Sequence, residues 1–250
     1  IDTDGGTTLL AGSTPMNVSQ ITKSNIYDTI VDIRTAMSKA KIPNDGKRYL
    51  LVTPDAMSLI LKSPEFISAS SLGDTVKESG AVGKIAGFLV IEWNDSTANL
   101  AMIAGHPRFA TKVNEWSVGI KVQDLSGSGN YIGASAVQGR MVYDHKVLRS
   151  VAIRAVYSPA TLAVSLAKGG TSGTTIATVT SGNTGSTYAY KVNPSARATY
   201  DMSTSAYAGT ALTSGTTEII ASAGDVIEIV NLSSSKVKAV AYITVGGGDV

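Results

Sequence analysis

Residues 78–110 restrict most strongly what this chain can fold into, because they hold two apolar strands joined by turn-forming residues. Gly83 and Gly87 give the backbone the freedom for tight turns ahead of the apolar run at 88–93. That run is rich in β-branched and aromatic residues, which predicts a strand inside a sheet rather than at its edge. Residues 100–104 predict a second apolar strand. No acid, base or nucleophile in the segment is arranged for chemistry, so its contribution is shape.

Composition sets wide limits on the function. At 250 residues, of which 43% are hydrophobic, the chain is long enough for two domains with buried cores. A net charge of +2 argues against a dedicated binder of nucleic acid or of a membrane surface, whose affinity needs a strongly basic face. No cysteine and only two histidines are present, which excludes disulfides, thiolate sites and multi-histidine metal centres. The sequence also lacks the apolar run of about 20 residues that spans a bilayer.

The N-terminal part of the chain predicts two helices and a strand. Residues 1–21 show no period and are interpreted as a linker or arm. Ser24 is the expected N-cap of a first helix. One apolar stripe on this helix consists of Ile26, Ile30, Ile33 and Met37. Residues 47–52 predict a buried strand, and Thr53 and Pro54 begin a second, short helix.

Residues 105–157 complete an α+β layer arrangement. Apolar residues alternate with other residues at 118–122, which predicts a half-buried strand. The Gly- and Ser-rich residues 123–133 predict an exposed loop tip between strands. Residues 139–157 alternate over an unusual length, so we predict a long strand with a break near Asp144.

The composition changes near Ser158 and Pro159. Before this point the chain has 16 basic and 14 acidic residues, and after it 5 of each. The remainder predicts short strands separated by turns, which is typical of a β-sandwich. Disorder is the alternative for sequence this rich in Ser and Gly, but apolar runs such as 226–230 supply a core that disordered segments lack. The expected strands are 161–166, 174–180, 188–192, 218–221, 226–230 and 237–245.

The familiar catalytic motifs are missing from the sequence. A phosphate-binding loop would need a glycine where Glu78 stands, and the glycines within 127–133 miss the dinucleotide spacing. His106 is isolated, and neighbours such as Asp144 and His145 point to opposite faces of a strand. We therefore expect a structural or binding protein that is not an enzyme and holds no cofactor and no metal.

Four segments carry recognisable patterns in a fixed order. They are RYLLVTP at 48–54, GAVGKIAGFLVIEWN at 80–94, AMIAGHPRFA at 101–110 and the strand at 139–153. Together they resemble the major capsid proteins of tailed bacteriophages, whose Hong Kong-phage coat fold is shared with encapsulins. The chain departs from the family pattern at Glu92 and Trp93, where small polar residues are usual, and at Asp144 and His145, where Tyr-Gly is common.

The resemblance implies a capsid axial domain with part of the peripheral domain at 22–159. A second resemblance concerns 160–250: YKVNPSARATY at 190–200 and GDVIEIVNLSSSKVKAVAYITV at 224–245 are similar to the immunoglobulin-like β domains appended to phage structural proteins. The family's N-terminal arm, extended hairpin and spine helix would lie upstream, so a chain that begins with Ile1 is expected to be a fragment. Such a subunit is made in the bacterial host cytoplasm and assembles with copies of itself into an icosahedral shell, the virion capsid. It contacts packaged DNA non-specifically; portal, scaffold or decoration proteins are further implied partners, and no membrane is implied.

Exposed charges and the loop tip are the expected contacts between subunits. On the capsid hypothesis, residues 126–131 would lie near a capsomer axis. The candidates are Arg108, Lys112, Ser126, Asn130, Arg140 and Arg149. Each charged one is explained equally well as a solvated side chain, because a surface ion pair contributes only about 0 to 1 kcal/mol.

A surface adhesin or carbohydrate-binding module is the alternative from another class of function. It would act through the C-terminal sandwich, with Tyr188, Tyr190, Tyr200 and Tyr207 as a sugar-stacking platform, although burial in the core is the simpler expectation for the first two. An encapsulin-like compartment shares the fold but leaves the appended β domain unexplained. Closed shells formed with the natural upstream sequence would favour the capsid, whereas monomers that bind glycans would favour the adhesin.

Overall fold

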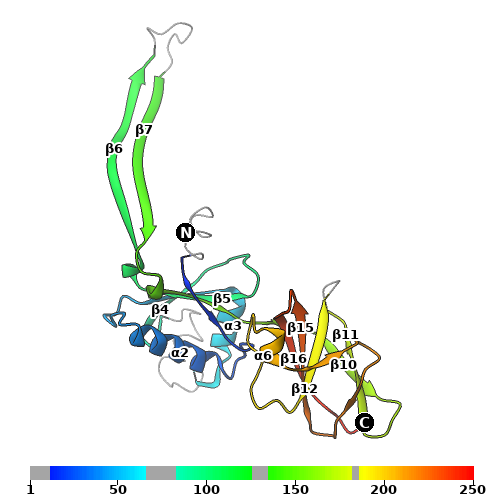
Figure 1. Ribbon diagram of the computed structural model, residues 1–250. Helices are drawn as coiled ribbons and strands as arrows, with labels where there is room; N and C mark the ends of the chain where they lie inside the picture. Colours follow the sequence, from blue (N-terminus) through cyan, green and yellow to red (C-terminus); the bar gives the residue numbers. More distant parts are fainter. Residues whose placement is uncertain (1–11, 66–82, 126–134, 182–185) are drawn as a thin grey trace.

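A computed structural model describes residues 12–65, 83–125, 135–181 and 186–250. Figure 1 shows a six-stranded sheet with helices, a long two-stranded ribbon that projects from it, and a β-rich C-terminal part. The described residues are mostly strand with few helices, so the expected α+β class is confirmed. Among these residues, no helix is both long enough and apolar enough to cross a membrane.

The six-stranded sheet gathers strands from distant parts of the chain in the order β1-β8-β5-β2-β4-β3. The strands are β1 (Thr14–Asn17), β2 (Tyr49–Val52), β3 (Lys84–Ile85), β4 (Phe88–Glu92), β5 (Leu100–Gly105) and β8 (Ile153–Tyr157). Helices α2 (Ile26–Lys39) and α3 (Pro54–Leu61) cover one face and bury the main apolar core against it. The other face carries a smaller apolar cluster and no helix among the described residues.

Both helices bury the residues that their sequence patterns indicate. The stripe that α2 buries consists of Ile26, Ile30, Ile33 and Met37, as predicted. Ser24 as the N-cap is wrong: the cap position is Asn25, whose Oδ1 accepts a hydrogen bond from Thr22 N at 2.7 Å instead of capping the helix. The prediction for α3 is confirmed, because the Thr53 hydroxyl accepts a hydrogen bond from Ala56 N.

Residues 1–21 contribute more than the linker or arm expected from their sequence. Thr14–Asn17 form β1, which pairs in parallel with β8 and places Thr14 opposite Arg154. This strand lies at the edge of the sheet and buries none of its side chains fully. Its sequence therefore carries no hydrophobic period that would reveal it.

The predicted strand at 88–93 is β4, and its side chains are less buried than its composition suggests. It lies next to the sheet edge, with the two-residue β3 as its outer neighbour. Phe88 and Val90 point into the core beneath the helices, whereas Leu89 and Ile91 are exposed on the other face. The prediction that this strand lies inside the sheet is therefore confirmed. The burial that this prediction implies is found for Phe88 and Val90 but not for Leu89 and Ile91.

A buried arginine holds the end of α2 against the sheet. Arg48 is almost completely buried, and its Nε donates a hydrogen bond to Pro43 O at 2.9 Å. Its two terminal nitrogens donate to Ile42 O at 2.5 Å and to Ser38 Oγ at 3.2 Å. The two carbonyl acceptors lie in the loop after α2, where no neighbouring strand or helical turn supplies a regular row of donors. One side chain thus replaces several missing backbone partners.

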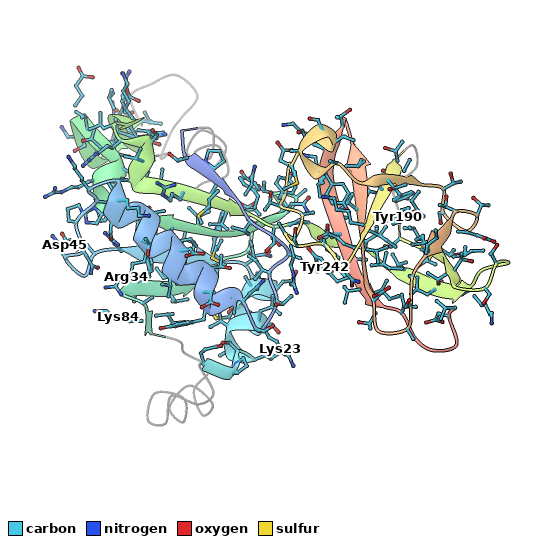
Figure 2. All side chains as sticks on the ribbon, turned by 60° about the horizontal axis from the view of Figure 1, so that its bottom comes forward. Lys23, Arg34, Asp45, Lys84, Tyr190 and Tyr242 are labelled. Atoms are coloured by element: carbon cyan, nitrogen blue, oxygen red, sulfur yellow. The ribbon has the colours of Figure 1, made fainter. Side chains whose placement is uncertain are left out.

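The two histidines have different surroundings. His106 is buried; its Nε2 lies 3.0 Å from Asp45 Oδ1, and its Nδ1 accepts a hydrogen bond from Arg108 N. The contact with His106 holds the pKa of Asp45 below its usual value. Figure 2 shows Asp45 in the loop after α2, with Arg34 on the helix surface. His145 is exposed on β7, so the two histidines have no shared site.

A long antiparallel hairpin lies in the sequence between β5 and β8, two strands of the six-stranded sheet. It consists of β6 (Ala110–Asp124) and β7 (Ser135–Val147), and Figure 1 shows it projecting from the sheet without support on either face. Short 3-10 helices, η1 (Pro107–Phe109) and η2 (Ser150–Ala152), lie at its base. This hairpin at 110–147 is a different element from the extended hairpin that the resemblance places upstream of the chain.

Two predictions for this region are wrong. Residues 118–122 belong to β6, where Ile120 and Val122 are exposed rather than half-buried, because nothing in the described chain packs on them. The strand predicted at 139–157 is interrupted after Val147 by the turn at η2, not near Asp144. The region around 105–110 combines the two alternatives that its sequence suggests, a helical turn followed at once by a strand.

The C-terminal part consists of two sheets that pack face to face. Their strand orders are β10-β11-β14 and β13-β12-β15-β16-β9. One apolar core joins Ala177 and Ile219 of the smaller sheet with Ile227 and Ile229 of the larger. The elements are β9 (Ala160–Thr161), β10 (Val164–Lys168), β11 (Thr174–Val179), β12 (Thr187–Val192), α6 (Thr204–Tyr207), β13 (Thr210–Leu212), β14 (Glu218–Ile220), β15 (Val226–Ser233) and β16 (Lys236–Thr244). All six strands expected from the sequence are present, with the first divided into β9 and β10, whereas β13 and α6 were not predicted.

The segment after β1 ties the sandwich to the six-stranded sheet. Tyr200 N donates a hydrogen bond to Val18 O at 3.0 Å, and Ser19 forms a β-bridge with Thr199. The rings of Tyr157 and Tyr200 stack with their centroids 5.6 Å apart. The two parts are therefore joined by non-covalent contacts in addition to the chain that runs from β8 to β9.

Candidate assembly surface

The hairpin and the turn at its base carry most of the large apolar side chains that are exposed in the described chain. Ile120, Val122 and Val137 expose 80%, 71% and 68% of their surface. Soluble monomers rarely expose such side chains as a contiguous group, and an isolated two-stranded hairpin is at best marginally stable in water. The hairpin therefore has the properties of a surface that is covered by something other than the described residues.

The pairing register places the apolar side chains on defined faces. Val122 lies directly opposite Val137. Ile120 is also exposed, two residues earlier on β6, where the register is irregular between Val118 and Lys121. We call these three side chains the tip face; none of them is charged. Closer to the base, Lys112 Nζ lies 4.7 Å from the centre of the Tyr143 ring, so a cation partly covers that aromatic surface.

The charged candidates for subunit contacts are distributed along this hairpin and its base. Arg108 lies in η1 and is exposed, whereas Arg149 lies just before η2 and is half-buried. Lys112 lies on β6 and Arg140 on β7, both exposed. Placement on one projecting element is compatible with contacts to other subunits but does not test them. The two remaining candidates, in the loop tip outside the described residues, are Ser126 and Asn130.

The four tyrosines suggested as a sugar platform do not lie on one surface. Tyr188 and Tyr190 pack against the core between the two sheets, which was the simpler expectation. Tyr207 is buried on the opposite side of the larger sheet, and this burial raises its pKa well above the usual value. Tyr200 stacks on Tyr157 at the junction. The prediction that these four tyrosines form one sugar-stacking platform is therefore wrong.

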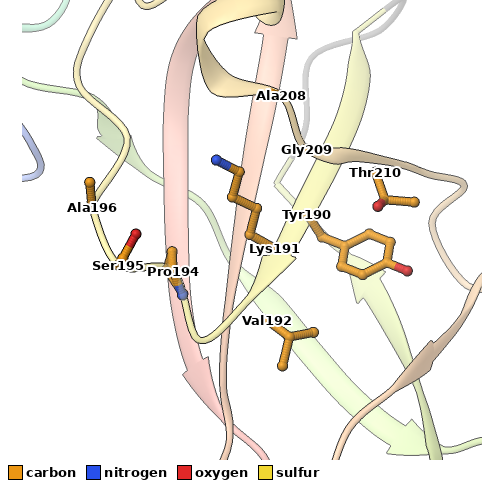
Figure 3. Close-up of a pocket in the computed structure, with 9 residues that line it drawn as sticks. All are labelled: Tyr190, Lys191, Val192, Pro194, Ser195, Ala196, Ala208, Gly209 and Thr210. Carbon is orange, nitrogen blue, oxygen red and sulfur yellow. The ribbon is translucent and has the colours of Figure 1, made fainter.

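The sandwich has an open hollow on its surface (Figure 3). It has a volume of about 400 Å³, and Tyr190, Lys191, Ser195 and Thr210 are among its lining residues. Lys191 Nζ lies 4.8 Å from the ring centre of Tyr207, which holds the ammonium over the ring rather than in the hollow. The described chain has no group of three acidic, histidine or cysteine side chains that could hold a metal ion. The hollow therefore offers hydroxyl groups for hydrogen bonding and little else.

An ion cluster stabilises the junction between the two parts. The Asp201 carboxylate binds Nζ of Lys236 and Nζ of Lys238, each at 2.5 Å. Lys238 Nζ also lies 3.3 Å from the hydroxyl of Tyr200. The hydrogen bond from Lys236, followed by that from Lys238, lowers the pKa of Asp201. The cluster thereby fixes the loop that contacts the segment after β1.

We expect the ion cluster to lose its stabilising effect in acid. The folded-state pKa of Asp201 is below its unfolded value of about 3.9, so the stabilisation is fully present above about pH 4 and is lost as the pH falls through the folded-state pKa. Asp201→Asn should lower Tm at neutral pH and reduce the fall in Tm between about pH 6 and about pH 3. Thermal denaturation followed by circular dichroism measures both. Glu92→Gln, at an exposed carboxylate, is the control; equal acid sensitivity in both variants would contradict this role of Asp201.

No family model matches the chain, and no curated protein does. Solved structures similar to it include one from Mycobacterium phage Che8, at 20% identity and a TM-score of 0.47, over 59% of this chain and 54% of that one. The capsid structure of cyanophage P-SCSP1u is similar at 14% identity and a TM-score of 0.47, over 58% of this chain and 53% of that one. Domains 7, 8 and 9 of the S-layer protein SbsC are similar at 22% identity and a TM-score of 0.33, over 53% of this chain and 48% of that one. The chain thus spans about half the length of each of these structures.

Proposed function

We propose that this chain is a structural subunit that assembles with copies of itself. The observation that carries the proposal is the projecting hairpin, whose exposed apolar side chains Ile120, Val122 and Val137 have no packing partner in the described chain. Burying apolar surface of this kind stabilises association by roughly 25 cal/mol per Å² before the entropy of association is subtracted. Even a small apolar contact stabilises an assembly when symmetry repeats it many times.

Within that class, the role that fits is the major capsid protein of a tailed bacteriophage. Its support is the position of the four family-like sequence segments in the fold. Residues 48–54 contain β2, 80–94 contain β4, 101–110 contain most of β5, and 139–153 lead into β8. The strands β8, β5, β2 and β4 are consecutive neighbours in one sheet, so segments that are far apart in the sequence form one structural unit.

In this role, copies of the chain form an icosahedral shell, the virion capsid, which encloses phage DNA without reading its sequence. Residues 22–159 correspond to the axial domain with part of the peripheral domain, and 160–250 to an immunoglobulin-like domain on the outer surface. No step of this role needs a catalytic residue or a cofactor. The subunit contacts would include the charged and tip-loop candidates Arg108, Lys112, Ser126, Asn130, Arg140 and Arg149.

A single charge on the tip face tests the proposal. Val122→Asp should abolish self-association, because a carboxylate buried in an apolar interface without a partner is strongly unfavourable. It should change the free energy of unfolding by no more than about 0.5 kcal/mol, because Val122 is exposed. Sedimentation velocity over a range of protein concentrations measures the association, and urea denaturation measures the stability.

Ile220→Asp is the matched control, because Ile220 is also a highly exposed apolar residue on a strand but lies on the sandwich. It should associate like the unmodified chain. If the unmodified chain stays monomeric at every concentration, the proposed function fails. Electron microscopy of the chain with its natural upstream sequence tests the more specific role: regular closed shells support the capsid assignment, and their absence contradicts it.

A further inference from the structure

We propose that His106 is a pH-sensitive latch: its neutral ring fixes the base of the long hairpin, and its protonated ring releases it. The ring lies where β5 leaves the six-stranded sheet, and Asp45 and Arg108 contact its two nitrogens. The latch acts within one chain, so it does not depend on what the chain assembles with. Its effect is on the direction of a ribbon that projects from the sheet (Figure 1).

The hydrogen bonds of His106 define a neutral ring. A backbone N–H can only donate, so His106 Nδ1, which accepts from Arg108 N at 3.1 Å, carries a lone pair and no proton. The ring proton is then on Nε2, which donates it to Asp45 Oδ1 at 3.0 Å. Both nitrogens therefore have a partner only when the ring is neutral with its proton on Nε2.

A proton on Nδ1 sets two hydrogen-bond donors against each other. Both nitrogens of a protonated histidine are donors, so the bond from Arg108 N is replaced by a contact between two N–H groups 3.1 Å apart. The hydrogen bond to Asp45 remains possible and becomes charge-assisted. Proton binding therefore breaks the contact of the ring with η1 while the contact with the loop after α2 persists.

The surroundings of His106 also oppose a charged ring in the closed arrangement. His106 exposes only 1% of its surface, and a buried charge is unfavourable unless it is fully paired. The register pairs Tyr49 of β2 with Gly105 of β5, so the buried Arg48 and His106 follow as the next opposite residues. The titratable and charged side chains on the elements around the ring are Asp45, Arg48, Tyr49, Arg108, Arg149 and Arg154. Asp45 is the one acid of this set, so opening relieves a protonated ring of mainly positive neighbours.

His106 joins the segments that meet at the base of the hairpin. Its backbone N donates to Ala152 O in η2 at 3.0 Å, and its carbonyl accepts from Phe109 N in η1 at 2.9 Å. Phe109 O in turn accepts from Leu148 N at 2.8 Å and Arg149 N at 3.0 Å, where the hairpin returns to the sheet. The side chain adds the loop after α2 to these contacts. Because η1 and η2 connect the hairpin with β5 and β8, loosening η1 frees one of its two attachments.

Hydrogen exchange of single amides, measured by NMR on the full chain, tests the latch. Between about pH 7.5 and about pH 5.5 we expect the protection factor of the Arg108 amide, relative to an unstructured peptide at the same pH, to fall at least about tenfold, because opening takes up one proton. His106→Asn should abolish this fall, because the Asn side-chain oxygen accepts a hydrogen bond from the backbone N–H two residues on and does not titrate. His145→Asn is the matched control, because His145 is the other histidine of the chain and is exposed on the hairpin. It should respond to pH like the unmodified chain.

The imidazole nitrogen shifts of the unmodified chain give a second measurement that needs no variant. At about pH 7.5 they should show His106 with its proton on Nε2, and protonation of Nδ1 should accompany the loss of protection at the Arg108 amide. If Nδ1 gains its proton while that amide stays protected, His106 is not the latch. A protection factor that is equal at both pH values, or a fall that persists in His106→Asn, would overturn the proposal as well.

Discussion

Arg48→Ala is expected to lower the free energy of unfolding by about 3 kcal/mol, because it removes a buried side chain that donates several hydrogen bonds at once. The guanidinium supplies Pro43 O, Ile42 O and Ser38 Oγ, and it is almost completely buried. Alanine would leave the two carbonyl groups without this donor and open a cavity between α2 and the sheet. Urea denaturation followed by circular dichroism measures the change.

Two further variants separate this role from a general effect of charge. Lys47→Ala removes the neighbouring cation, which is exposed, and should change the free energy of unfolding by less than about 0.5 kcal/mol. Arg48→Lys keeps the charge but lacks the planar fork, so it should recover only part of the lost stability. If Arg48→Ala were as stable as Lys47→Ala, the carbonyl groups after α2 would have to find other partners, and the account of Arg48 would be wrong.

The elements that follow from local sequence rules are those whose stabilising partners are also local. The apolar stripe of α2 recurs at the helical period, and the Thr53 hydroxyl caps α3 by accepting a hydrogen bond from the backbone N–H of the third residue after it. Strand β1 does not follow from such rules, because it is held by pairing with β8, its neighbour in the sheet but a distant segment in the sequence. Nor does the burial of Arg48, whose partners are mainly backbone carbonyls that every sequence contains.

The candidate assembly surface shows the same limit. The alternation at 118–122 indicates a strand with an apolar side, but it does not say whether the partner of that side lies in the same chain. In the structure Ile120 and Val122 have no partner there, so the pattern that predicted a half-buried strand identifies a free surface instead. The charged candidates were chosen by type alone, and the geometry adds only that Arg108, Lys112 and Arg140 belong to this one element and its base.

Phe88→Ala is expected to lower the free energy of unfolding by about 3 to 4 kcal/mol, because Phe88 is fully buried in the core between β4 and the helices. Leu89→Ala, one residue further along the same strand, should lower it by no more than about 1 kcal/mol, because that side chain is partly exposed. Urea denaturation of both variants measures the difference. Equal losses would mean that the exposed face of β4 is covered within the chain.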